Sequence, residues 1–284
     1  MQKATRVATI LAILAGGALC AARQDRKPDP MTPDPNGPRP IAAHDTLFIE
    51  EMTWMEVRDA LKAGKDTVLV AAGGIEQNGP YVVTGKHNVV LRATTQAIAE
   101  KLGNALIAPI LGFVPEGDFE PPTDHMKYPG TIGVSEETFR RLVADVCSSL
   151  RVHGFRHIIL IGDHGPDQEG LEQVSTELSK KWAGGATRVH YIAEYYDDDV
   201  LAPWLEKQGL KQSDEGLHDD FIMEAQLMVV DPSTVRMKQR IAAGKFRING
   251  VDLAPAEKTI EWGRKIVTYR ADLSVAAIRK ATGR

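Results

Sequence analysis

Two segments of the sequence combine glycines with carboxylate and imidazole side chains. The first contains Glu76 and His87, and the second contains Asp163 and His164. Carboxylate oxygens and imidazole nitrogens are ligands for Zn²⁺ and similar divalent ions. Two histidines and a glutamate that leave one coordination position open would form a catalytic site, because the ion lowers the pKa of bound water and supplies hydroxide near neutral pH. The glycines allow the backbone to turn sharply beside a ligand.

Both segments directly follow short apolar runs that have the length and composition of buried strands. Apolar residues at helical spacing, with capping residues before them and glycines after them, occupy the stretches between the runs. Strands are predicted over residues 67–72, 105–110, 157–161 and 188–193, and helices between Thr53 and Gly64 and over residues 89–102, 135–153, 168–182, 221–230 and 255–280.

This alternation predicts that the two segments lie together in space. Continuous apolar strands that alternate with helices indicate a parallel sheet with helices on both faces. Ligand sites in such sheets lie at the carboxyl ends of the strands. Glu76, His87, Asp163 and His164 should therefore share one edge of the sheet. A glycine-rich turn with a glutamate and a histidine is also a common structural turn, but convergence from two strand ends favours a metal site.

The composition excludes several classes of protein. The chain has 284 residues, of which 43% are hydrophobic and 25% charged, an ordinary globular balance. Its formal net charge is −4 and it has no block of five or more basic residues, which argues against a nucleic-acid partner. Neither a dinucleotide-binding glycine motif nor a P-loop is present. The two cysteines, Cys20 and Cys147, cannot form a disulfide framework or a cysteine-based zinc site.

The N-terminal residues have the layout of a secretory signal peptide. Lys3 and Arg6 precede an apolar run over residues 7–19, and small residues follow up to Ala22. The run is too short to span a bilayer comfortably, so we expect no membrane span after cleavage. The predicted signal, residues 1–22, implies a periplasmic or secreted protein. A short anchor, a misassigned start or lipidation at Cys20 are the alternatives.

A proline-rich stretch follows the predicted signal. Six prolines between residues 24 and 43 fix the backbone and remove hydrogen-bond donors, so residues 23–43 are predicted to be a linker without regular structure. Residues 44–284 then form a single domain. Cleavage of the signal would leave Cys147 alone, which an oxidising compartment tolerates when the thiol is buried.

Several motifs in this domain resemble those of the creatininase (creatinine amidohydrolase) family, in order and in spacing. That family shows E-Q-H-G-P-H, F-P-G-T, N-G-H-G-G-N, H-A-G-E-x-E-T-S and E-K-G-R. The similar stretches here are residues 76–80 (EQNGP), 128–132 (YPGTI), 162–165 (GDHG), 218–228 and 261–264 (EWGR), so the resemblance covers about residues 50–280.

The resemblance implies a fold, an activity and an assembly. The fold is a three-layer αβα arrangement with a mostly parallel central sheet. The activity is that of a metal-dependent amidohydrolase, typically with zinc or manganese. Members of the family open cyclic amides, remove formyl groups or cleave small peptides, so a small-molecule substrate is expected. They are often oligomeric, so a homo-oligomer is expected too.

Two departures from the family motifs change the expected metal site. Asn78 stands where the family has a histidine, and His87 stands where it has an aspartate that bridges two ions. Asparagine is a weak ligand, and a neutral imidazole does not bridge as a carboxylate does. We therefore expect one zinc or manganese ion rather than two, with Glu76, His87 and His164 as its ligands.

The resemblance also predicts residues around the ion. His218 matches the histidine of H-A-G, which is cast as a proton carrier, and its charge can change near neutral pH. Glu224 and Asp163 are further catalytic candidates, which either complete the ligand set or orient an imidazole. His125, just before the Y-P-G-T motif, and Tyr81, which replaces a family histidine, are expected to contact the substrate.

These expectations describe the hydrolysis of a C–N bond in a small cyclic amide or formamide. Water activated by the ion attacks the carbonyl, nearby donors stabilise the oxyanion, and His218 or a carboxylate passes a proton to the leaving nitrogen. Two alternatives remain open: a hydrolase or isomerase of another small carbonyl compound such as a lactone, and a catalytically inactive periplasmic binding relative. Specificity is expected to depend on residues 112–130 and 195–220, whose structure the sequence does not predict.

Overall fold

The four predicted strands form one parallel sheet. The computed structural model describes residues 31–284, apart from the side chain of Asp198. The strands β1 (Thr67–Ala72), β2 (Ala105–Ile107), β3 (His157–Gly162) and β4 (Arg188–Tyr191) are arranged in the order β2-β1-β3-β4. β1 and β3 are the central pair and run in register until Ala72 lies opposite Gly162. The polypeptide therefore leaves both strands at the same point of the carboxyl edge.

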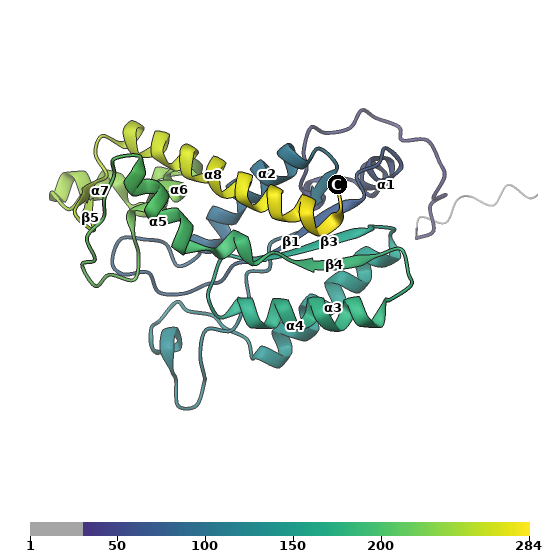
Figure 1. Cartoon of the computed structure of the whole chain (residues 1–284), viewed down its shortest axis with the longest axis horizontal. Coiled ribbons are helices and arrows are strands. Elements are labelled where there is room, and N and C mark those ends of the chain that lie inside the picture. Colours follow the sequence, from purple (N-terminus) through teal and green to yellow (C-terminus); the bar gives the residue numbers. More distant parts are fainter. Residues whose placement is uncertain (1–30) are drawn as a thin grey trace, which may run out of the picture. The chain divides into compact units, whose positions relative to one another are not determined.

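Helices cover both faces of this sheet, which confirms the predicted α/β fold with three layers (Figure 1). Alternate residues of each strand point to opposite faces. On one face Val68 and Val70 pack with α3 (Glu136–Val152) and α4 (Asp167–Lys181). On the other face Leu69 and Ala71 pack with α2 (Lys86–Leu102) and the C-terminal α8 (Ala256–Thr282). Helix α1 (Trp54–Lys62) begins with the expected capping box of Thr53 and Glu56.

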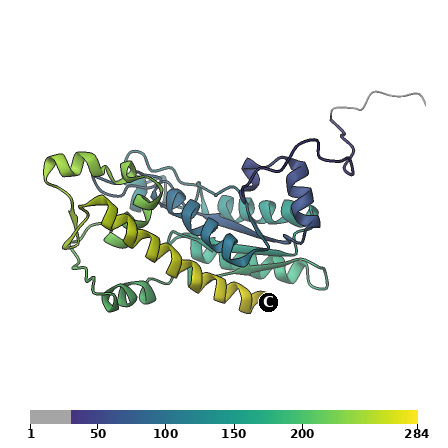
Figure 2. The ribbon, with the colours of Figure 1, turned by 90° about the horizontal axis from the view of Figure 1, so that it is seen from above.

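A third apolar cluster is formed largely by short elements, and the sequence predicted only some of them. Helix α6 (Phe221–Val230) has the predicted bounds, but α5 (Asp198–Lys207), α7 (Met237–Ala243) and the hairpin of β5 (Arg247–Ile248) and β6 (Val251–Asp252) were not predicted (Figure 2). Helix α5 contains Pro203, and it is held by the burial of Leu201 and Leu205 in this cluster. Such short elements depend on tertiary packing rather than on local periodicity.

Helices α6 and α8 approach each other unusually closely. A Cβ atom added at Gly263 of α8 would lie 2.0 Å from the carbonyl oxygen of Ala225 in α6. No side chain fits in that space, so the close packing requires glycine at this position.

Residues 41–284 form one compact unit, and residues 31–40 belong to a separate one that contains a turn at Asp34. The predicted signal peptide and the first part of the predicted linker lie outside the described residues. Residues 31–43 contain no helix or strand. Among residues 31–284, none of the helices is both long and apolar enough to span a membrane.

Candidate metal centre

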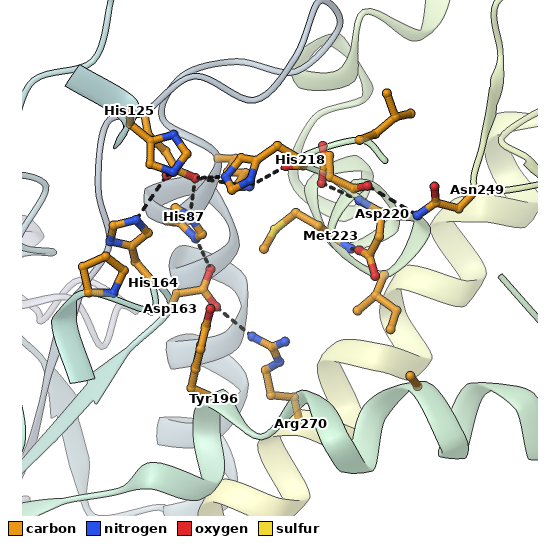
Figure 3. Close-up of a pocket in the computed structure, with 18 residues that line it drawn as sticks. His87, His125, Asp163, His164, Tyr196, His218, Asp220, Met223, Asn249 and Arg270 are labelled. Atoms are coloured by element: carbon orange, nitrogen blue, oxygen red, sulfur yellow. Dashed lines mark hydrogen bonds and ion pairs between the residues drawn. The ribbon is translucent and has the colours of Figure 1, made fainter. Parts of the chain in front are cut away.

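The predicted ligands converge at the carboxyl edge of the sheet. Glu76 follows β1, and His87 lies in the first turn of α2, which begins three residues earlier than predicted. His164 follows β3, so the register of β1 and β3 brings it next to Glu76. His125 and His218 reach the same point from the β2–α3 connection and from the segment before α6. Together they line a pocket of about 440 Å³ (Figure 3).

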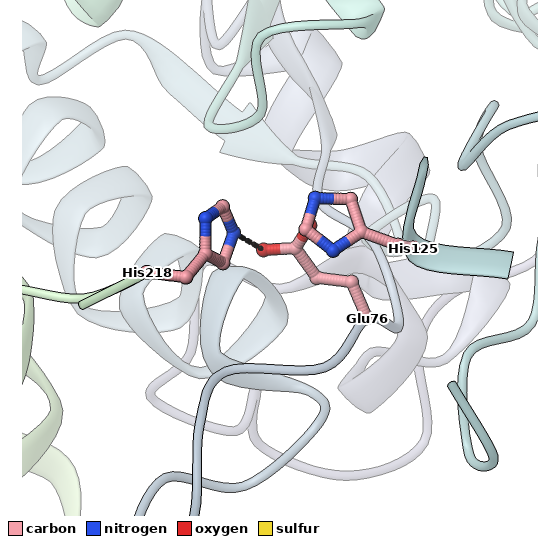
Figure 4. Close-up of side chains that lie close together, drawn as sticks. All are labelled: Glu76, His125 and His218. Atoms are coloured by element: carbon pink, nitrogen blue, oxygen red, sulfur yellow. Dashed lines mark hydrogen bonds and ion pairs between the residues drawn. The ribbon is translucent and has the colours of Figure 1, made fainter. Parts of the chain in front are cut away.

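The carboxylate of Glu76 is the centre of the arrangement and is 0% exposed. Its Oε1 lies 2.9 Å from Nε2 of His87, 3.2 Å from Nε2 of His218 and 3.3 Å from Nζ of Lys86. Its Oε2 lies 3.1 Å from Nε2 of His164 and 3.0 Å from Nε2 of His125. Figure 4 shows Glu76 between His125 and His218. One carboxylate thus accepts contacts from four imidazoles and an ammonium group.

These contacts determine which groups are charged. Burial opposes ionisation of Glu76, but hydrogen bonds from His164, His218 and His87 and the charge of Lys86 hold its pKa well below its usual range. Burial also opposes protonation of His164, yet its carboxylate neighbours Asp167 and Glu76 raise the pKa of this ring to about 10. A divalent cation would therefore compete with protons for the Nε2 atoms.

The other nitrogen of each buried ring is held by a different carboxylate. Nδ1 of His87 lies 2.9 Å from Oδ2 of Asp163, and Nδ1 of His164 lies 3.4 Å from Oδ1 of Asp167. Asp163 in turn accepts hydrogen bonds from Arg270 at 2.7 Å and from the hydroxyl of Tyr195 at 3.0 Å. Carboxylates on Nδ1 fix the ring orientation and direct the Nε2 lone pair toward a metal ion.

The donor set fits a divalent metal ion such as zinc or manganese. Ligand atoms of Glu76, His87 and His164 all lie within 4.8 Å of one another, and all three residues are buried. Glu76 also forms a second, more exposed group with His125 and His218. Oxygen and imidazole donors of this kind suit both ions. The structure thus brings together all three predicted ligands, with Asp163 placed to orient His87 rather than to join them.

Two predicted site residues lie elsewhere. Oε2 of Glu224 is paired with Nη1 of Arg240 at 2.6 Å, and both side chains are buried. The guanidinium of Arg240 also stacks on the ring of Tyr81, 4.5 Å from its centroid. Neither Glu224 nor Tyr81 lines the pocket. The structure therefore places the predicted catalytic residue Glu224 and the predicted substrate contact Tyr81 beside Arg240, which lies on the unpredicted helix α7.

Several residues of the centre were not predicted. Lys86 is adjacent to His87, and Asp167 follows His164 by three residues at the start of α4, so their positions carried a local signal. Glu116 follows β2, the strand next to β1, and a search of every strand end for carboxylates would have included it. Arg270 lies in the middle of α8, where nothing in the local sequence marks it.

Comparisons with known proteins agree with this architecture. The family model "Creatininase: Creatinine amidohydrolase" matches residues 50–278. The chain is 25% identical over 156 residues to creatinine amidohydrolase from Pseudomonas putida, covering 54% of this chain and 58% of that protein. It is 28% identical over 122 residues to 3-dehydro-scyllo-inosose hydrolase from Thermotoga maritima, covering 43% of this chain and 37% of that protein. The chain therefore aligns with less than two thirds of either relative.

Solved structures share the fold. A crystal structure of creatinine amidohydrolase (creatininase) covers 84% of this chain and 98% of its own length, with a TM-score of 0.58 and 20% identity. A mutant creatininase of Zn-Zn type has a TM-score of 0.60 at 20% identity, over 84% of this chain and 99% of its own. A structure named creatininase Mn has a TM-score of 0.59 at 20% identity, over 83% of this chain and 98% of its own.

Proposed function

Since this chain belongs to the creatininase (creatinine amidohydrolase) family, we propose that it is a metal-dependent hydrolase that cleaves a C–N bond of a small cyclic amide or formamide. One observation carries the proposal. Nε2 atoms of two buried histidines, His87 and His164, converge on the buried carboxylate of Glu76 at the carboxyl edge of a parallel sheet. This is where α/β proteins bind ligands.

The residues that would hold the ion are Glu76, His87 and His164. When bound, a zinc or manganese ion acidifies a water molecule and polarises a carbonyl oxygen. Asp163 and Asp167 keep the two rings oriented by accepting hydrogen bonds from their Nδ1 atoms.

His218 is the proposed proton carrier of the reaction. Its Nε2 lies 3.2 Å from Oε1 of Glu76, and its side chain is 46% exposed, so the ring faces both the centre and the entering substrate. A histidine at such a position can hold a proton at Nε2 and donate it to a leaving nitrogen. The ring of His125 lies 4.5 Å from that of His218 and faces the same space, where we propose that it contacts the substrate.

The pocket itself favours a small substrate. Its volume of about 440 Å³ is within the range of small-molecule sites. The lining of the pocket also includes the apolar side chains of Leu217, Ile222 and Met223. A compact ring with one apolar face and a carbonyl that an ion held by Glu76, His87 and His164 would polarise fits this combination.

Elemental analysis of the purified protein, followed by assays over cyclic amides, hydantoins, lactams and formamides, tests the proposal. We expect zinc or manganese in the protein and release of an amine or an opened ring. His164→Ala should lose both the metal and the activity, while His153→Ala, at an exposed position after α3, should keep both. Retention of metal and activity by His164→Ala would refute the proposal.

A second candidate function is the hydrolysis of a different small carbonyl compound, such as a lactone or a cyclic ketone. The similarity to the inosose hydrolase of Thermotoga maritima favours it. Lactones and polyhydroxylated cyclic ketones therefore belong in the same panel, and a product that contains an acid but no amine would identify this class. An inactive binding relative would bind such compounds without turnover.

We also propose export and self-association. Cys147 is 0% exposed in α3 and burial raises its thiol pKa to about 12, which makes it compatible with an oxidising compartment. Exposed apolar side chains in the β2–α3 connection support a homo-oligomer; they are Phe113, Phe119, Tyr128 and Ile132. N-terminal sequencing of the mature protein tests cleavage near Ala22, and light scattering tests the oligomer.

A further inference from the structure

A second carboxylate, that of Glu116, approaches the same nitrogen of His164 that Glu76 contacts. Oε2 of Glu116 lies 3.4 Å from Nε2 of His164, and the same nitrogen lies 3.1 Å from Oε2 of Glu76. Asp163 and Asp167 contact the other nitrogen of each ring, the Nδ1 atoms of His87 and His164. Glu116 therefore occupies the ligand side of His164 rather than its supporting side.

The surroundings of Glu116 are built to hold this carboxylate. Its side chain is 1% exposed, and its Oε1 accepts a hydrogen bond of 3.2 Å from the backbone N–H of Ile75. A Cβ added at Gly74 would lie 2.7 Å from that oxygen, and one at Gly133 would lie 3.0 Å from Cβ of Glu116. Glycines at both positions leave the space that the glutamate occupies.

The second oxygen of Glu116 has no hydrogen-bond partner among the described residues, although it is buried. An unpartnered buried carboxylate oxygen is costly, and most buried polar atoms in proteins are satisfied. The nearest group that can carry positive charge is the ring of His164, whose Nε2 lies 3.4 Å away, and a cation bound at this nitrogen would replace its proton. A second carboxylate would also add negative charge, because Glu76 and neutral imidazoles supply only one negative charge to a divalent ion in a buried site.

One donor pair that includes Glu116 has the separation expected of two ligands on one ion. Zinc ligands lie about 2.0–2.2 Å from the metal, so ligand atoms in neighbouring positions are roughly 3.0–3.6 Å apart. The distance of 3.4 Å between Nε2 of His164 and Oε2 of Glu116 matches that separation.

We propose that Glu116 is a metal ligand, so that two glutamates and two histidines, Glu76, Glu116, His87 and His164, hold one zinc-like divalent ion with a fifth position left for water. This inference rests on the proposed function, because it adds a ligand to the same centre. It gives the site two negative charges for one divalent cation, and it assigns a role to a residue that neither lines the pocket nor was expected from the sequence.

Zinc binding by wild type and Glu116→Gln tests the inference, with Glu224→Gln, the same change at a buried glutamate that is paired with Arg240 away from the centre, as the control for zinc affinity. Zinc affinity is measured by competition with a chromophoric chelator, and melting temperatures are measured with and without zinc. Glu116→Gln keeps an oxygen for Ile75 and removes a buried charge. We expect its zinc affinity to fall by at least about tenfold while its metal-free melting temperature stays the same or rises.

A purely structural role for Glu116 would give the reverse pattern, with a lower melting temperature in both forms and unchanged zinc affinity, and would overturn the inference. A crystal structure of the zinc-loaded wild type decides the matter even if Glu116→Gln does not fold. A Glu116 oxygen at bonding distance supports the inference, whereas a longer separation contradicts it. Absence of both zinc and manganese binding by the wild type would refute the proposed function itself.

Discussion

Two buried glutamates in this molecule have partners of different chemistry. Glu224 is paired with Arg240, whose guanidinium is always charged. Glu76 is surrounded by imidazoles and by Lys86. A guanidinium cannot give up its proton, so Arg240 stays charged beside Glu224 and is not exchanged for a metal ion. Imidazoles can exchange protons for a metal ion, so the charge of Glu76 remains available. The chemistry of the partners, rather than burial, separates the candidate centre from a structural ion pair.

The largest effect is expected at Glu76. Glu76→Gln removes the carboxylate on which four imidazole nitrogens converge, so zinc affinity should fall by at least roughly a hundredfold, as for the loss of one member of a buried charged pair. Chelator competition measures this change, and circular dichroism checks the fold. Zinc binding of wild-type strength in this variant would abolish the distinction between the two glutamates.

The same substitution at Glu224 should affect stability instead. Glu224→Gln leaves Arg240 buried without its counter-charge, so the free energy of unfolding should fall by about 3–5 kcal/mol. Urea denaturation measures the loss. Because the pair does not line the pocket, zinc affinity should stay within about twofold of the wild-type value. A large loss of zinc affinity without a loss of stability would show that Glu224 belongs to the centre after all.

A smaller effect is expected from the carboxylate behind His87. Asp163→Asn weakens the hydrogen bond that orients the ring, so metal affinity should fall about 10–100-fold. Tyr195→Phe removes only one of the donors to Asp163 and should cost less. Metal titration of both variants checks this order. Equal losses in the two would mean that the network, rather than the Asp163–His87 contact, sets the affinity.

The affinity for zinc should rise as the pH rises. The pKa of His164 is about 10, so its ring carries a proton at neutral pH that the cation must displace. Affinity should therefore rise with pH below this value, by about tenfold per pH unit for each proton released. Calorimetry in buffers of different ionisation enthalpy counts the protons. A pH-independent affinity with no proton release would contradict the exchange of protons for metal at Glu76.

The sequence predicted element bounds and the convergence of the three candidate ligands where the local hydrophobic pattern matches the tertiary fold. β1 and α6 have their predicted bounds, and the parallel pairing of β1 with β3 was enough to bring Glu76, His87 and His164 together. The position of Glu224 outside the pocket was not predictable, because its partner Arg240 lies on a short helix without a clear periodicity. Glu116 lies in an irregular connection, and its approach to His164 depends on tertiary contacts that no spacing encodes.

The glycine at position 263 affects the orientation of the His87 imidazole through a chain of contacts. Arg270 lies about two turns beyond Gly263 on the same helix, and it supports Asp163, which orients that ring. Because the helix backbone rests directly against α6, even a methyl group at 263 would displace the helix and withdraw the guanidinium from its carboxylate. The absence of a side chain at position 263, remote from the pocket, thereby helps to orient the imidazole of a metal ligand.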